Sequence, residues 1–223
     1  MTYFNSFRYI LLDFDGTCID SMPFLENNAV QLLTQYLGMS AEQAAFHYRK
    51  TTGLPFVQQM EIISPNSSSG NSKIVEKFEK MKIDRIYEQH PFQETPFVLE
   101  ELNTRGYCVG ISSGTYEEII RDYLDLKGLS HFIHDILGWR PGFEKGKDHF
   151  EYIMNQYNLK PDQLIFVGDS LNDAKRSLSN DIYFIARKGM FRAEDFERVI
   201  PNVLVVDSLS ELLDLLPPIN LGE

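Results

Sequence analysis

The spacing of apolar positions along the chain changes twice, from strand-like to helical and then to an alternation of the two. Near the start, four apolar or aromatic residues, Tyr9 to Leu12, run directly into an acidic pair, which is typical of a strand buried on both faces. From about residue 19 to 92 the apolar positions recur at helical spacing, without a convincing strand pattern. From Glu94 onward, short apolar runs alternate with helical segments. This order predicts an α/β protein with a parallel sheet and a helical segment inserted after its first strand.

The inserted segment is predicted to hold four helices. Ser21 is typical of the residue before a helix, and Gly38 of the residue after one. Ser40 and Gln43 form a capping-box pattern at the start of the second helix. The polar stretch 64–72 predicts a surface loop. The predicted helices cover about 21–37, 40–50, 56–62 and 73–89.

The rest of the chain is predicted to alternate between strands and helices. Thr115 and Glu118 form another capping-box pattern, which predicts a helix start soon after the second strand. Ser208 is expected to cap the last helix, which ends before Pro217. Helices fill the intervals between strands, among them about 95–106 and 147–158. The predicted strands cover 107–111, 131–137, 164–167, 182–186 and 203–206.

The composition narrows the classes of partner. The formal net charge of -11 argues against nucleic acid or an anionic membrane surface as a main partner. Cys18 and Cys108 form no disulfide framework and lie in apolar segments, so we expect free thiols in a reducing compartment. No apolar run reaches the roughly 18 residues of a membrane span, and a signal pattern is lacking. We expect a cytoplasmic protein without a membrane partner, either a monomer or a dimer.

Acidic and hydroxyl residues gather at the ends of three predicted strands. They are Asp13 and Asp15, Ser112 and Ser113, and Asp169 and Asp173. Because the carboxyl ends of parallel strands share one edge of a sheet, we expect these three segments to meet at one site. Carboxylates there suit a hard cation, and a cation beside hydroxyl donors suits a phosphoryl group.

The order of these motifs resembles that of the haloacid dehalogenase-like hydrolase superfamily. The resemblance is to its phosphatase branch with a helical cap, such as phosphoglycolate phosphatases and β-phosphoglucomutases. It implies a Rossmann-like core domain, residues 1–18 and 93–223, and a helical cap domain, residues 19–92. The residues that carry the resemblance are Asp13-Phe14-Asp15-Gly16-Thr17, Ser112, a lysine that opens a later helix, and Gly168-Asp169-Ser170-Leu171-Asn172-Asp173.

The resemblance implies a role for each acidic residue. Asp13 would attack phosphorus and form an aspartyl-phosphate. Asp15 would protonate the leaving oxygen and then deprotonate the attacking water. A Mg²⁺ ion would be bound by the Asp13 side chain, the backbone carbonyl of Asp15 and Asp169. Asp173 would be a further ligand, or an anchor for one.

A phosphate-binding set is implied as well. The Ser112 hydroxyl would donate to a phosphoryl oxygen, and the backbone amides of Ser113 and Gly114 would add to this contact. The catalytic lysine has two candidates, Lys145 and Lys147. The family usually has Lys-Pro here, and this chain lacks that proline. Lys147 is preferred because it starts the predicted helix, where its ammonium would keep the nucleophile ionised; Lys145 is the alternative.

The cap is expected to face the substrate with the stretch 49–55, which resembles the substrate loop of related phosphatases. Arg49, Thr52 and Gly53 are the candidate contacts, and Arg49 or Lys50 would hold a substrate anion. A solvated basic turn is the other interpretation of this stretch. The five histidines show no metal-binding spacing and are interpreted as structural or surface residues.

Together these features predict a Mg²⁺-dependent phosphatase that acts on a small phosphate ester. Phosphoglycolate and other small sugar or alcohol phosphates are the substrates that the resemblance suggests, and a nucleotide monophosphate stays open. A sugar phosphomutase of the same superfamily is the alternative enzyme, which product analysis would separate because only hydrolysis releases inorganic phosphate. A catalytically silent binding protein of this fold is the non-enzymatic alternative.

Overall fold

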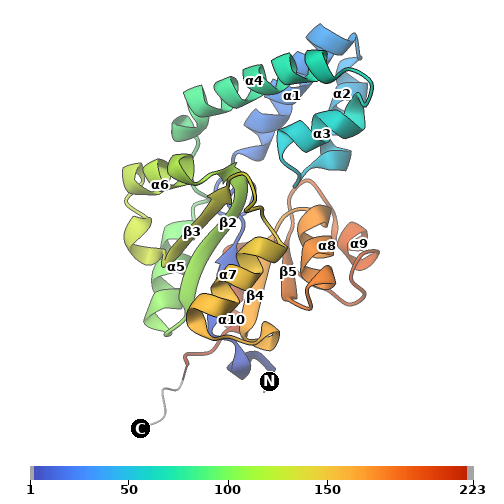
Figure 1. Ribbon diagram of the computed structural model, residues 1–223. Coiled ribbons are helices and arrows are strands. Elements are labelled where there is room, and N and C mark those ends of the chain that lie inside the picture. The colour runs from blue at the N-terminus through green and yellow to red at the C-terminus, as the bar shows by residue number, and fades with distance from the viewer. Residues whose placement is uncertain (1–2, 220–223) are drawn as a thin grey trace.

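Six parallel strands form the sheet at the centre of the structure, a computed structural model that describes residues 3–219 (Figure 1). The first strand, β1 (Tyr9–Leu12), is buried along its whole length between β2 (Cys108–Tyr116) and β4 (Leu164–Gly168). The order across the sheet is β3-β2-β1-β4-β5-β6. This confirms the predicted parallel sheet and the buried first strand. The remaining strands are β3 (Asp135–Trp139), β5 (Tyr183–Arg187) and β6 (Leu204–Val206).

One face of the sheet is covered by three helices. Side chains alternate between the faces of a strand, so Ile10 and Leu12 of β1 point to this side. They join an apolar core with residues of α5 (Thr95–Thr104), α6 (Glu117–Leu126) and α10 (Leu212–Leu215). Short 3₁₀ helices complete the connections, at Tyr3–Ser6, Ile86–Glu88, Ser130–Phe132, Pro161–Gln163 and Leu209–Glu211.

The opposite face has a core of its own. Tyr9 and Leu11 of β1 point to this side. They pack with residues of α7 (Lys147–Tyr157), α8 (Leu171–Ser179) and α9 (Ala193–Glu197). The sheet is therefore the middle layer of a three-layer α/β arrangement (Figure 1), as sheets buried on both faces are in α/β proteins.

Four helices between β1 and β2 form a helical insert that stands beyond the carboxyl ends of the strands (Figure 1). The insert has a third apolar core, in which Leu33, Tyr48 and Phe78 are buried. The predicted domain boundaries at residues 19 and 92 stay a prediction. The helices of the insert are α1 (Met22–Leu37), α2 (Ala41–Thr51), α3 (Phe56–Ile63) and α4 (Ser68–Arg85).

The predicted loop at 64–72 is wrong in its second half, because α4 already begins at Ser68. The buried Asn71 explains the difference. Its side-chain amide donates hydrogen bonds to the carbonyls of Met60 and Ser64, at distances of 3.1 and 2.8 Å. These bonds satisfy carbonyls at the end of α3 and fix the first turn of α4 against it. The polar composition of the stretch therefore serves a helix–helix junction.

The predicted capping box at Thr115 and Glu118 is also wrong. Strand β2 continues to Tyr116, α6 begins at Glu117, and no side chain caps it. The Thr115 hydroxyl instead donates a hydrogen bond to the side chain of Asp15. The short helix α9 was not predicted. None of the helices within residues 3–219 is both long and apolar enough to cross a membrane.

Candidate active site

Three acidic side chains meet where β1 and β4 end. The two strands pair in parallel with Leu12 beside Val167, so the residues that follow each strand emerge side by side. Carboxylate oxygens of the three residues lie within 4.8 Å of one another, and all three side chains are buried. The predicted convergence of the strand ends is therefore present. The three residues are Asp13, Asp169 and Asp173.

A buried lysine connects two of these carboxylates. Lys145 Nζ lies 2.7 Å from Asp13 Oδ1 and 2.7 Å from Asp173 Oδ1. Burial lowers the pKa of Lys145, but the two carboxylates outweigh it and raise the pKa above its ordinary value. The sequence-based preference for Lys147 is corrected: its side chain is 69% exposed and lies 3.7 Å from Glu151.

The backbone before α7 explains why Lys145 and not Lys147 enters the site. Gly146 has a φ of 111°, a conformation that L-residues rarely adopt and that proline cannot adopt at all. This turn leaves Lys145 pointing toward Asp13, and the helix that begins at Lys147 directs that side chain outward. The Lys-Pro pattern expected from the resemblance would not fit here, because a proline at position 146 could not adopt this φ.

The three carboxylates carry more negative charge than Lys145 offsets. Burial raises the pKa of Asp13 to about 7; Lys145 opposes this, and the charge of Asp173 adds to it. Burial and the charge of Asp13 also raise the pKa of Asp169. Asp169 Oδ2 and Asp173 Oδ2 are buried without a hydrogen-bond partner. Unpartnered buried carboxylate oxygens are the donor set of a hard divalent cation, so these residues could hold one.

Asp15 lies outside that cluster and is held by three donors from different parts of the chain. Ser21 Oγ donates to Asp15 Oδ1 at 2.7 Å, and Thr115 Oγ1 donates to Asp15 Oδ2 at 2.7 Å. Lys82 Nζ, from α4 of the insert, lies 2.9 Å from Asp15 Oδ2 and also donates to Thr115. The predicted metal contact of Asp15 through its backbone carbonyl stays a prediction.

The surroundings of Asp15 favour its ionised form. Burial raises the pKa of Asp15, but the charge of Lys82 and the hydrogen bonds from Lys82, Ser21 and Thr115 outweigh burial and lower it below the ordinary value. Lys82 was missed from the sequence. The position of Lys82 could have identified it, because it lies four residues after Phe78, on the apolar face of an amphipathic helix. A charged residue on such a face needs a partner.

The two adjacent serines of β2, Ser112 and Ser113, point in opposite directions, as successive residues of a strand do. Ser112 Oγ is turned toward α7 and lies 2.8 Å from Nδ1 of the buried His149. Burial lowers the pKa of His149 to about 3, and the charge of Lys145 acts in the same direction. Ser113 and Gly114 line the cavity beside Asp13. Of the residues predicted to bind phosphate, Ser113 and Gly114 therefore border the candidate active site, whereas the Ser112 hydroxyl is turned away from it.

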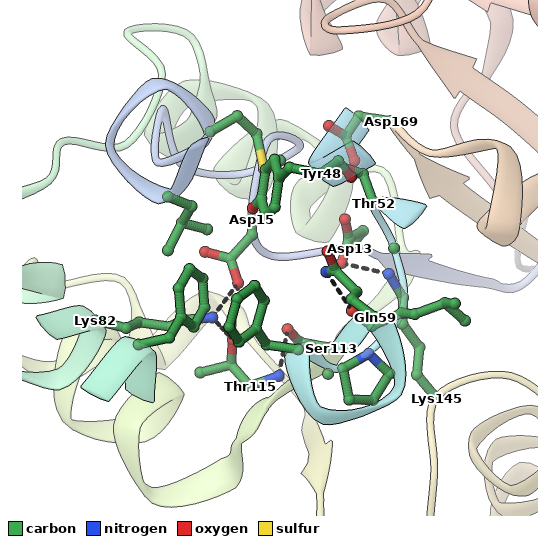
Figure 2. Close-up of a pocket in the computed structure, with 18 of the residues that line it drawn as sticks. Asp13, Asp15, Tyr48, Thr52, Gln59, Lys82, Ser113, Thr115, Lys145 and Asp169 are labelled. Carbon is green, nitrogen blue, oxygen red and sulfur yellow. Dashed lines mark hydrogen bonds and ion pairs between the residues drawn. The ribbon is translucent and has the colours of Figure 1, made fainter. Parts of the chain in front are cut away.

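A cavity of about 80 Å³ lies between the insert and the carboxyl ends of the strands. Thr52 and Gly53 line it, and their predicted contact with a substrate stays a prediction. Their carbonyls accept hydrogen bonds of 2.7 Å from Asn172 and Arg176 of α8, which hold the loop against the core. Figure 2 shows the side chains that converge on the cavity, among them Asp13, Asp15, Tyr48, Gln59, Lys82, Ser113, Lys145 and Asp169.

Arg49 does not line this cavity. Its side chain is exposed and forms an ion pair of 2.6 Å with Glu26 on α1. The expectation that Arg49 holds a substrate anion at the site is therefore not met by this arrangement. The alternative interpretation of a solvated basic turn fits its position better.

Residues 10–187 match a family model described as haloacid dehalogenase-like hydrolase. The chain is 27% identical over 219 residues to a phosphoglycolate phosphatase of Vibrio parahaemolyticus, covering 93% of this chain and 95% of that protein. It is 25% identical over 225 residues to a phosphoglycolate phosphatase of Aliivibrio fischeri, covering 96% of this chain and 98% of that protein.

Solved structures share the fold. A haloacid dehalogenase-like family hydrolase from Streptococcus pneumoniae superposes with a TM-score of 0.76 at 24% identity, covering 94% of this chain and 98% of that chain. A predicted phosphatase from Clostridium acetobutylicum gives a TM-score of 0.79 at 20% identity, covering 92% of this chain and 96% of that chain. With a family model matched from β1 to β5, the chain belongs to the haloacid dehalogenase-like hydrolases.

Proposed function

We propose that this protein is a Mg²⁺-dependent phosphatase that hydrolyses a small-molecule phosphate monoester through an aspartyl-phosphate on Asp13. The placement of Asp13 supports this most directly. Its carboxylate lies 2.7 Å from the ammonium of Lys145, beside Asp169 and Asp173, and borders the cavity that Asp15 also lines. A nucleophile, a proton donor and a cationic partner thus surround one small space.

Asp13 is the nucleophile in this proposal. Its carboxylate forms a bond to phosphorus while the bond from phosphorus to the leaving oxygen breaks. Burial raises the pKa of Asp13, and the positive charge of Lys145 acts in the opposite direction, toward the ionised form that attacks phosphorus. Lys145 also offsets the charge that a phosphoryl group brings to the site. The hydroxyl of Ser113 accepts a hydrogen bond from Thr115 N at 3.1 Å, which leaves its own proton available for a phosphoryl oxygen.

Asp15 is the acid and base in this proposal. It donates a proton to the leaving oxygen in the first step, and takes one from the water that attacks the aspartyl-phosphate in the second. The ionised form that Lys82 favours is the form required for the second step. Lys82 therefore links the insert directly to the residue that handles protons.

The metal is proposed to be Mg²⁺, because the available ligands are buried carboxylate oxygens. Asp13 and Asp169 would hold it together with the backbone carbonyl of Asp15, and Asp173 would serve as a further ligand or as the anchor of Lys145. When bound, the cation supplies positive charge that offsets the phosphoryl oxygens.

The insert is proposed to act as a cap that excludes water while the ester reacts. The hydrogen bonds from Asn172 and Arg176 to the loop at Thr52 and Gly53 would form when the cap closes. The relatives named phosphoglycolate phosphatases support a small phosphate ester as the class of substrate.

The test is release of inorganic phosphate from a panel of small phosphate esters, with Mg²⁺ or with a chelator, by the natural protein and by Asp13→Asn. Phosphate released only with Mg²⁺, and not by Asp13→Asn, is the expected result. Conversion of the ester into a phosphorylated isomer without phosphate release would instead indicate a phosphomutase. Equal release by Asp13→Asn would contradict the role of Asp13.

A further inference from the structure

The cavity beside Asp13 sets a limit on the size of the alcohol part of the ester. Its volume is about 80 Å³ in the arrangement with the insert held against the core. A phosphoryl group occupies much of that space, so only a few further non-hydrogen atoms can be enclosed with it.

Both cations that line the cavity are already paired. Lys145 lies 2.7 Å from Asp13 and 2.7 Å from Asp173, and Lys82 lies 2.9 Å from Asp15. Among residues 3–219, no other lysine or arginine lines the cavity. A second anion on the substrate would therefore have to take Lys82 away from Asp15, leaving that partly buried carboxylate without its charged partner.

An acidic residue lies on the same wall. Glu79 precedes Lys82 by one turn of α4 and lines the cavity. It makes no hydrogen bond or ion pair with another described residue. Burial raises its pKa; Lys82 opposes this, and Asp15 adds to it. A carboxylate or second phosphate on the substrate would face Glu79 and be disfavoured by it, whereas a hydroxyl or ammonium group could donate a hydrogen bond to it.

Uncharged side chains form the rest of this wall. The rings of Phe56 and Phe78 are stacked with their centroids 3.7 Å apart, and the Tyr48 ring lies 6.5 Å from that of Phe78. The Tyr48 hydroxyl makes no hydrogen bond within the described part of the chain, and Tyr48 lines the cavity (Figure 2). Ring faces favour methylene groups and, where a cation approaches, an ammonium group.

We propose that the substrate is the phosphate monoester of a small alcohol without a second anionic group, and that Glu79 is a residue that determines this specificity. The inference rests on the proposed phosphatase function and narrows its substrate class. The proposed substrate class excludes phosphoglycolate, the compound in the names of the relatives, because phosphoglycolate carries a carboxylate beside its phosphate.

The first test compares three esters with two-carbon alcohols of similar size. They are 2-phosphoglycolate, which carries a carboxylate, 2-hydroxyethyl phosphate, which is neutral at that end, and 2-aminoethyl phosphate, which carries an ammonium. We expect kcat/KM with Mg²⁺ to be about tenfold or more higher for the second and third esters than for 2-phosphoglycolate. Equal or faster hydrolysis of 2-phosphoglycolate would overturn the proposal.

The second test addresses Glu79 itself. Glu79→Gln is expected to raise kcat/KM for 2-phosphoglycolate relative to 2-hydroxyethyl phosphate by about tenfold. Glu76→Gln removes the same charge from an exposed position one turn earlier on α4 and is expected to leave that ratio unchanged. An unchanged ratio in Glu79→Gln, or an equal change in both variants, would overturn the role of Glu79.

Binding separates this inference from the proposed catalysis. Calorimetric titration of Asp13→Asn with each ester in the presence of Mg²⁺ reports affinity without turnover. Weaker binding of 2-phosphoglycolate than of the other two esters supports the inference even if the natural protein hydrolyses none of them, an outcome that would reject only the phosphatase proposal. Equal or tighter binding of 2-phosphoglycolate, or binding of none of the three, would reject the inference.

Discussion

Lys145 and its two carboxylate partners show how much of the candidate active site depends on single side chains. Lys145 is 8% exposed, and its ammonium contacts both Asp13 and Asp173. Removing one member of such a buried group leaves uncompensated charge on the others. The same ammonium lies 2.7 Å from the proposed nucleophile, so its loss should affect catalysis as well as folding.

Lys145→Met is expected to lower kcat for phosphate release by about a hundredfold or more, because the charge that keeps Asp13 ionised is removed. Lys147→Met is the matched control, since Lys147 is exposed and pairs only loosely with Glu151. Initial rates of phosphate release, with thermal melting to confirm folding, provide the measurement. A strong loss in Lys147→Met with Lys145→Met unaffected would contradict the assignment.

Lys82→Met is expected to move the acidic limb of the pH–rate profile to higher pH. Lys82 lowers the pKa of Asp15 in the natural protein; without its charge that pKa rises, and a higher pH is needed to ionise Asp15. The measurement is kcat across a range of pH, with an ester for which hydrolysis of the aspartyl-phosphate limits the rate, because that second step is the one that requires ionised Asp15. Lys80→Met, an exposed position on the same helix paired with Asp84, should leave the profile in place, and an unshifted profile in Lys82→Met would contradict the link.

At the scale of residues, the sequence predicted well which acidic residues lie at the ends of strands. It predicted less well in which direction the side chains point. Asp13 and Asp169 were found because they follow apolar runs that end in acidic residues. Ser112 and Ser113 are adjacent and chemically identical, so only the alternation of the strand decides which one lines the cavity. Lys145 is distinguished from its neighbour by the φ of 111° at Gly146, which no short sequence pattern reports.

At the scale of elements, the insert contacts α8 beside the cavity. The loop at Thr52 and Gly53 donates no side chain to this contact and is held through its carbonyls. A Cβ at Gly53 would lie 2.2 Å from Ser170 Oγ, and its φ is 89°. The loop therefore approaches α8 too closely for any residue other than glycine at position 53.

Gly53→Ala is expected to lower kcat/KM by about tenfold or more, because the loop must move away from α8 and the insert can no longer close over the ester. Gly128→Ala introduces comparable backbone strain at a φ of 69°, with no atom within 4 Å of the new Cβ. Steady-state kinetics and melting curves of both variants are compared. Equal losses of activity in the two variants would show that strain alone, and not the contact with α8, is responsible.

Element existence was predicted better than element bounds. The four helices of the insert and five later strands were all expected, since each shows a clear periodicity. The early start of α4 depends on Asn71 bonding across to the end of α3, and the extension of β2 depends on Thr115 bonding to Asp15. Both are contacts between segments distant in sequence, which local patterns cannot indicate.

At the scale of the whole molecule, three apolar cores surround one charged site. The two faces of the sheet and the insert each have a core of their own, and the acidic cluster lies where the sheet meets the insert. Burial of several carboxylates there costs stability that packing elsewhere must offset. A bound cation would offset that cost directly, because it binds the folded state alone.

Mg²⁺ is expected to raise the melting temperature of the natural protein by a few degrees, and that of Asp169→Asn by less. In a chelator, Asp169→Asn is expected to melt at or above the natural protein, because burial and Asp13 disfavour the ionised carboxylate that the substitution removes. Glu151→Gln, at an exposed position, should have the same melting temperature as the natural protein, both with Mg²⁺ and with the chelator. An equal gain from Mg²⁺ in Asp169→Asn would contradict the proposed ligand set.

The central claim is that Asp13 carries the phosphoryl group during the reaction. The protein is mixed with Mg²⁺ and an intact phosphate ester that it hydrolyses. The reaction is quenched in acid before turnover is complete, and the protein is digested for peptide mass spectrometry. The account predicts one phosphoryl group on the peptide that contains residues 9–17, attached at Asp13, and none in Asp13→Asn. Phosphate release by the natural protein with the phosphoryl group on another residue, or with Asp13→Asn equally active, would contradict it.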